Sequence, residues 1–247
     1  MRKINFAGGE PFLYPKYLGQ LLQFCKKDLA LESVSIVTNG SRVKDRFLST
    51  FGQYIDVLAV SCDSFNEEVN VRIGRGNGSH LPNVLRLSRL CREHGIKFKL
   101  NTVVNKYNYQ EDMNQQISEI QPFRWKCFQV LVIDGENDST ATLRNANPFT
   151  IIDEEYESFC NRHSHHKCFV PEPNNVMKSS YLILDEYMCF LNKGTGAPTG
   201  SILDIGVQEA LRQGYWDKSS FNKRGGIYDW SKTGESCATA RDPNLDW

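Results

Sequence analysis

Four cationic side chains interrupt stretches of sequence that otherwise read as buried β-strands. Each has a second polar residue two positions away, giving the pairs Lys3 and Asn5, Lys99 and Asn101, and Arg124 and Lys126. Ser61 and Asp63 form a further pair, and Asp63 is the one carboxylate in this set. Because alternate residues of a strand face the same side, each pair presents both side chains to one face of a sheet.

These cations need compensation, because burying an unpaired charge is costly. For any single cation, a position at the solvated start of a strand, or beside a loop carboxylate, is a sufficient explanation. Four together favour a polyanionic ligand on the sheet, and a nucleoside triphosphate is suitable. Arg75 lies in the glycine-rich segment 74–78, where it could reach phosphates from outside the sheet or belong to an ordinary turn.

Strand-like and helix-like segments alternate along the first half of the chain. The expected strands are 2–7, 33–38, 57–61, 97–104 and 125–133. The expected helices are 17–25, 43–51, 82–94 and 111–120, with a long loop before Pro82. This alternation predicts a parallel sheet, either open or closed into a barrel.

The alternation weakens after residue 137. We expect a helix at 153–163, strands at 181–190 and 202–205, and a helix at 207–213. The chain therefore divides into a region 1–136 that contains the sheet and an extension 137–247 that caps it.

Composition excludes several classes of protein. The 247 residues carry 29 basic and 29 acidic side chains, so net charge argues for neither nucleic acid nor an anionic membrane as a partner. The eight cysteines are scattered without a CxxC pair, which favours reduced thiols over a disulfide framework. The segment Cys160–Cys168 also contains three histidines and is a weak alternative candidate for zinc.

The stretch Gly8-Gly9-Glu10-Pro11, directly after the first expected strand, resembles the GGEP motif of the radical S-adenosylmethionine enzymes. Longer stretches resemble an interferon-inducible antiviral family within that superfamily, in the same order and over the whole chain. They are KINFAGGEPFL, SIVTNGS, VSCDSFNEEVN, IGRG, FKLNTVVN, RWKCFQVL, SYLILDEYM and KRGG.

This resemblance implies an incomplete (βα)6 partial TIM-like barrel of the radical S-adenosylmethionine type, with a C-terminal α+β extension. It implies an enzyme that uses S-adenosylmethionine and a [4Fe–4S] cluster to convert CTP into 3′-deoxy-3′,4′-didehydro-CTP, a lyase reaction in antiviral innate defence. Proteins of innate immune signalling and of iron–sulfur assembly are implied as partners.

The resemblance also assigns roles to individual residues. Gly8, Gly9 and Glu10 would hold the methionine portion of the cofactor, with Ser61 and Asp63 near its ribose. The residues implied to bind the triphosphate are Lys3, Arg75, Lys99, Lys126 and Arg224. Asn101 would lie near the nucleotide, and Tyr181 would complete the radical chemistry as a catalytic residue.

One departure from the family pattern is large. The CxxxCxxC motif that holds the cluster does not occur in these 247 residues. We therefore expect either a fragment or truncated form of a working enzyme, or a short form that binds nucleotide or protein without catalysis. The family lies on endoplasmic reticulum and lipid droplets through an amphipathic helix that this sequence does not contain. This chain is therefore expected in the cytosol, without direct membrane or nucleic-acid contact.

Overall fold

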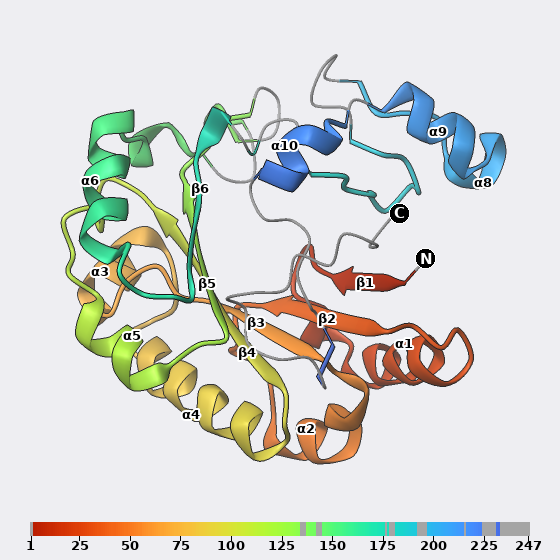
Figure 1. Ribbon diagram of the computed structural model, residues 1–247, viewed down its shortest axis with the longest axis horizontal. Coiled ribbons are helices and arrows are strands. Elements are labelled where there is room, and N and C mark those ends of the chain that lie inside the picture. Colours follow the sequence, from red (N-terminus) through yellow and green to blue (C-terminus); the bar gives the residue numbers. More distant parts are fainter. Residues whose placement is uncertain are drawn as a thin grey trace. The chain divides into compact units, whose positions relative to one another are not determined.

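The computed structural model describes residues 2–133, 137–141, 145–175, 177, 181–191, 197–214, 216–223 and 231–232. The strands are β1 (Lys3–Phe6), β2 (Ser33–Thr38), β3 (Val57–Ser61), β4 (Lys97–Val104), β5 (Arg124–Gln129) and β6 (Phe169–Glu172). The α-helices up to residue 163 are α1 (Pro15–Lys27), α2 (Asp45–Phe51), α3 (Glu67–Ile73), α4 (His80–Glu93), α5 (Asn114–Ile120) and α6 (Asp153–His163). Helices α8 (Ile202–Ile205), α9 (Val207–Gln213) and α10 (Lys218–Lys223) follow, as Figure 1 shows.

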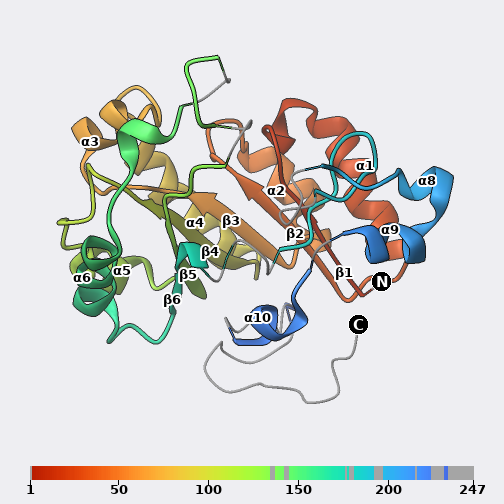
Figure 2. The same cartoon turned by 90° about the horizontal axis from the view of Figure 1, so that it is seen from above.

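The strands form one six-stranded sheet in chain order, from β1 to β6. The first four strands pair in parallel, and Figure 2 shows the order from β1 on the right to β6 on the left. A doubly wound sheet starts near its middle and reverses direction, whereas a (βα) barrel adds each strand on the same side of the last. The order therefore confirms the expected class, a partial TIM-like barrel.

The hydrophobic core lies between the sheet and the helices of its outer side (Figure 1). In α4 the residues Val84, Leu87 and Cys91 recur at helical spacing and are completely buried. They belong to the same core as Leu58 and Leu100 from β3 and β4. Burying each leucine contributes roughly 1.5–3 kcal/mol to folding, so this layer holds the strands in register.

One helix occupies a segment that was expected to be a loop. The seven residues of α3 begin after Asn66, whose side-chain oxygen accepts hydrogen bonds from the backbone N–H groups of Glu68 and Val69. The helix ends at Gly74 in the left-handed conformation, with φ of +84°. The prediction of a loop was wrong here, because the cap at each end stabilises a helix too short to show a clear apolar period.

Two predicted strands were also wrong. Residues 202–205 form the helix α8, with the Ser201 hydroxyl accepting from Leu203 N–H. Residues 181–190 contain only an isolated bridge between Leu184 and Phe190 in place of a strand. The last strand of the sheet, β6, was not predicted, since its four residues include a proline and a glutamate.

The chain divides into two compact units. The first comprises Met1–Phe128, Ile151–Pro171 and Tyr228–Trp247, and the second Gln129–Thr150 and Glu172–Ile227. The predicted roles of 1–136 as barrel and of 137–247 as a capping extension stay predictions. Among the helices of the described residues, none is long and apolar enough to cross a membrane.

Candidate functional site

The polar pairs of β3 and β4 lie on the sheet face opposite the helices. Phe98 and Leu100 of β4 belong to the core, so Lys99 and Asn101 face the other way. The parallel register places Ala59 beside Lys99 and Ser61 beside Asn101. The i, i+2 pattern therefore identified the face correctly, and the register brings Ser61 and Asn101 together.

The outer strands continue this polar face. On β1, Asn5 lies beside Ser35 of β2, and the Ser35 hydroxyl donates to Asn5 Oδ1 over 2.7 Å. Lys3 follows the same alternation, beside Ser33.

On β5, Trp125 and Cys127 belong to the core, so Arg124 and Lys126 lie on the polar face. Lys99 is 8% exposed and Lys126 is 3% exposed. Two buried lysines are an environment that a polyanion would stabilise.

Asn101 carries an orphaned acceptor on this face. Its Oδ1 atom is buried and has no hydrogen-bond partner among the described residues. A buried polar atom without a partner costs free energy, so the site is suited to a ligand that donates a hydrogen bond.

The Gly8-Gly9-Glu10 segment follows β1. Gly8 and Gly9 have φ of +87° and +52°, and a Cβ atom at either position would meet nothing within 4 Å. The backbone conformation, and the open space beside it, therefore explain the glycines and leave the backbone accessible. An accessible backbone is compatible with the expected contact to the methionine portion of S-adenosylmethionine, and that contact stays a prediction.

Glu10 has a different role from the two glycines in the structure. Its carboxylate accepts hydrogen bonds from Thr38 Oγ1 at 2.6 Å, from Asn39 N–H at 2.8 Å and from Phe12 N–H at 3.1 Å. These bonds join the end of β1 to the end of β2. The side chain of Glu10 thus shapes the strand ends, and its expected contact with the cofactor stays a prediction.

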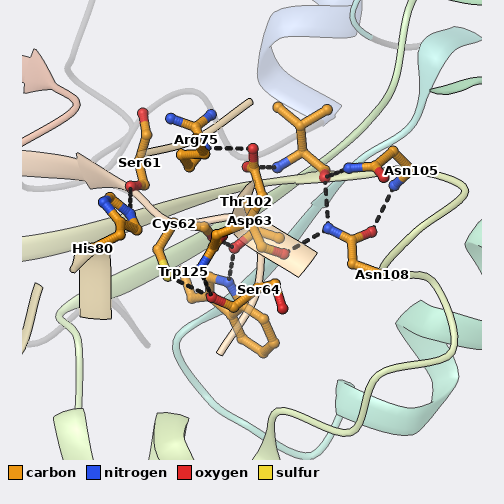
Figure 3. Close-up of polar contacts among 12 residues, drawn as sticks. Ser61, Cys62, Asp63, Ser64, Arg75, His80, Thr102, Asn105, Asn108 and Trp125 are labelled. Carbon is orange, nitrogen blue, oxygen red and sulfur yellow. Dashed lines mark hydrogen bonds and ion pairs between the residues drawn. The ribbon is translucent and has the colours of Figure 1, made fainter. Parts of the chain in front are cut away.

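Asp63 and Arg75 meet beyond the end of β3 (Figure 3). Asp63 Oδ2 accepts from Arg75 Nε at 2.5 Å, and Asp63 Oδ1 accepts from Val103 N–H at 2.8 Å. The family resemblance implied different ligands for these two residues, the cofactor for Asp63 and the triphosphate for Arg75. Their direct contact was not predicted.

Several residues that hold this region were missed by the sequence analysis. Asn108 donates through Nδ2 to the Asp63 carbonyl at 2.6 Å and to the Val103 carbonyl at 2.9 Å (Figure 3). His80, at the start of α4, lies 2.9 Å from the Ser61 carbonyl through Nε2. A carbonyl can only accept, so Nε2 carries the proton, and burial lowers the pKa of His80.

A second, partly buried carboxylate supports the same loop. Glu111 accepts from Ser64 Oγ at 2.6 Å and from Phe65 N–H at 2.7 Å, and burial raises its pKa. The available signal was the asparagine-rich turn Asn105-Lys106-Tyr107-Asn108 directly after β4, since asparagine side chains commonly bond to nearby backbone.

Two predicted site residues belong to other parts of the chain. Tyr181 belongs to the second unit and lies outside any helix or strand. Arg224 lies outside the described residues. The roles of both stay predictions.

The described residues do not supply a metal site. They contain no group of three or more histidine, cysteine, aspartate or glutamate side chains that could hold a metal ion. In the Cys160–Cys168 segment, His163 is completely buried and accepts from Met113 N–H at 3.1 Å, so the zinc alternative was wrong there. The described part of the chain likewise contains no group of cysteines that could hold a [4Fe–4S] cluster.

Comparison with known proteins agrees with this architecture. The family model of the radical SAM superfamily matches residues 1–116. The structure of native anSMEcpe with bound AdoMet has a TM-score of 0.59 at 13% sequence identity, covering 85% of this chain and 65% of that chain. Streptococcus suis SuiB bound to S-adenosylmethionine has a TM-score of 0.59 at 16% identity, covering 90% and 56%.

Curated relatives are much more similar in sequence. The S-adenosylmethionine-dependent nucleotide dehydratase RSAD2 of Oncorhynchus mykiss is 48% identical over 253 residues, covering 100% of this chain and 70% of that protein. The protein of the same name from Danio rerio is 48% identical, covering 100% and 68%. A nucleotide dehydratase of Lacinutrix mariniflava is 40% identical, covering 93% and 48%.

The fold and the strand-end site define a protein of the radical S-adenosylmethionine superfamily. Within that superfamily the chain belongs to the viperin family of S-adenosylmethionine-dependent nucleotide dehydratases.

Proposed function

We propose that this chain forms the nucleotide- and cofactor-binding part of an antiviral, S-adenosylmethionine-dependent dehydratase that converts CTP into 3′-deoxy-3′,4′-didehydro-CTP. The observation that carries the proposal is the gathering of Lys99 and Lys126, both buried, on the sheet face that also presents the orphaned Asn101 oxygen. Family membership supports a nucleotide as the ligand, and the buried cations support its phosphates as the recognised part.

Under this proposal the site residues have three roles: they bind the triphosphate, the nucleoside and the cofactor. Lys99 and Lys126, with Lys3 and Arg75 at the margins, neutralise the triphosphate. Asn101 accepts a hydrogen bond from the nucleoside. The Gly8 and Gly9 backbone holds the methionine portion of S-adenosylmethionine, which, when bound and reduced, supplies the radical of this family's chemistry.

Calorimetric titration with CTP tests the phosphate assignment. Lys99→Ala and Lys126→Ala should each weaken CTP binding at least tenfold, since each removes a charge-assisted contact of roughly 1.5–3 kcal/mol. Lys16→Ala is the matched control, because Lys16 is exposed on α1. Binding of CTP by both site variants with the affinity of the parent would show that the face is wrongly assigned.

A second candidate, nucleotide binding without turnover, is favoured by one observation. The CxxxCxxC motif does not occur in the sequence, and the described residues hold no metal-ligand group. Anaerobic treatment of the 247-residue chain with iron and sulfide, then addition of S-adenosylmethionine and dithionite as reductant and an assay for 5′-deoxyadenosine, separates the two candidates. Release of 5′-deoxyadenosine would exclude the second candidate for this chain.

A further inference from the structure

Asp63 is held rigidly by groups from β4 and the loop that follows it. The residue is 2% exposed, its Oδ1 accepts from Val103 N–H at 2.8 Å, and its carbonyl accepts from Asn108 Nδ2 at 2.6 Å. Asn108 is itself fixed, because its Oδ1 accepts from Asn105 N–H at 2.7 Å. The second carboxylate oxygen of Asp63 therefore has a defined position.

Arg75 uses only a small part of its hydrogen-bonding capacity. A guanidinium has five N–H donors in a rigid planar fork. The Nε–H group donates to Asp63 Oδ2 at 2.5 Å, and the four terminal N–H donors have no acceptor among the described residues. Figure 3 shows the contact between the guanidinium and the carboxylate.

The backbone of Arg75 lies among glycines and is anchored by one hydrogen bond. Gly74, Gly76 and Gly78 all have positive φ, of +84°, +83° and +91°. The Arg75 N–H donates to the Asn70 carbonyl at 2.7 Å, which fixes the start of the side chain. The stem of an arginine has several rotatable bonds, so its far end has rotational freedom unless a contact holds it. Contact with a rigid carboxylate removes this rotational freedom before a ligand binds, which lowers the entropic cost of binding.

We propose that Asp63 is a positioning residue for Arg75, which it holds by Nε so that the four terminal donors are presented to the phosphates of the nucleotide. This inference rests on the proposed function, because it takes the triphosphate as the ligand. It gives Asp63 a role in substrate recognition that is separate from its expected place near the cofactor ribose. The carboxylate acts on the nucleotide only through Arg75.

The same ion pair could instead oppose phosphate binding, and the two possibilities predict opposite changes in phosphate affinity when Asp63 is removed. If Asp63 merely neutralised Arg75, its removal would release the cation and strengthen phosphate binding. If Asp63 positions Arg75, its removal weakens phosphate binding although a negative charge has been lost.

Asp63→Asn isolates the contact. The asparagine Oδ1 can still accept from Val103 N–H, while its NH₂ group replaces the acceptor that faces Arg75 Nε–H. We would titrate the parent, Asp63→Asn, Arg75→Ala and the double variant with CTP, inorganic tripolyphosphate and S-adenosylmethionine. Thermal unfolding would check that each variant folds.

The expected result is a loss of about tenfold in affinity for CTP and tripolyphosphate in Asp63→Asn, of the order of one charge-assisted hydrogen bond. Arg75→Ala should lose at least as much, and the double variant no more than Arg75→Ala alone, because the two residues act as a unit. An unchanged or increased affinity in Asp63→Asn, or additive losses, would overturn the inference.

Two further arms keep the result unambiguous. If Asp63→Asn does not fold, Asp63→Glu is the substitute, because it keeps the charge but moves it. Positioning still predicts that Asp63→Glu loses affinity for tripolyphosphate. In a chain that already carries Arg75→Ala, the same substitution should cause no further loss. If the parent binds neither CTP nor tripolyphosphate, the proposed function fails together with this inference. Binding by the parent with no effect of either Asp63 variant refutes the inference alone.

Discussion

Two buried aspartates flank β3, and their partner cations differ in how many of their donors are used. Asp56 precedes β3 and Asp63 lies beyond its end, and both are 2% exposed. Asp56 pairs with Lys26 at 2.8 Å and accepts from Val34 N–H at 2.8 Å and from Lys232 N–H at 3.1 Å. Asp63 pairs with Arg75 and leaves most of that cation's donors available.

The difference lies in how completely each cation is satisfied. The ammonium group of Lys26 donates to Asp56 and to the carbonyls of Leu31 at 3.1 Å and Glu32 at 2.9 Å, which uses all three of its donors. Arg75 uses one donor of five within the described residues. A saturated ion pair at the start of the strand stabilises the fold, whereas an unsaturated pair at its end is available to a ligand.

The comparison predicts the largest change in stability at Asp56. Asp56→Ala should lower the free energy of unfolding by about 3–5 kcal/mol, because it leaves Lys26 and the Val34 N–H without their shared acceptor. Urea denaturation measures this value. Asp45→Ala is the control, because the Asp45 carboxylate that pairs with Arg86 is exposed, and it should change stability by less than about 1 kcal/mol. A loss of CTP affinity in the folded fraction of Asp56→Ala would contradict the assignment of Asp56 to stability alone.

The imidazole of His163, whose two ring nitrogens both have hydrogen-bond partners, should make the free energy of unfolding depend on pH. His163 is buried, and burial lowers its pKa from 6.5 to about 4. Its Nδ1 donates to the Phe159 carbonyl at 2.8 Å, and its unprotonated Nε2 accepts from Met113 N–H at 3.1 Å.

The unfolded chain binds a proton here at a higher pH than the folded chain does. Stability is therefore complete above pH 6.5 and falls by about 3 kcal/mol as the pH drops to about 4. Unfolding titrations at several pH values check this slope. His163→Gln should flatten the slope, while the exposed His165→Gln should keep it. An unchanged slope in His163→Gln would mean that other groups cause the loss.

The smallest effect on stability is expected at Asn101. Asn101→Ala removes an oxygen that has no partner among the described residues, so the free energy of unfolding should change by less than about 1 kcal/mol. Affinity for CTP should fall about fivefold, the order of one neutral hydrogen bond. Calorimetry and urea denaturation on the same sample separate the two effects. Gln115→Ala, exposed on α5, is the control, and a large loss of stability without loss of affinity would assign Asn101 to the fold.

Much of the sheet could be predicted from short-range patterns. The strands at 33–38, 57–61 and 97–104 have the expected bounds, because runs of valine, isoleucine and leucine favour buried parallel strands. The polar face was predicted for the same reason, since alternation along a strand does not depend on its neighbours. Short apolar runs such as 202–205 were wrong because they are compatible with either a strand or a helix.

The sequence by itself therefore determined the first five strands of the sheet and which of their side chains share a face. The GGEP motif and the longer stretches that resemble the family also indicated where the chain belongs. Only the tertiary structure decided which polar groups satisfy one another. Asn108 reaches Asp63 from 45 residues away, and Lys232 reaches Asp56 from 176 residues away. Such contacts depend on strand register and loop conformation, which the packing of the whole core sets. No local pattern therefore distinguishes Asp56, whose cation is saturated, from Asp63, whose cation keeps further donors.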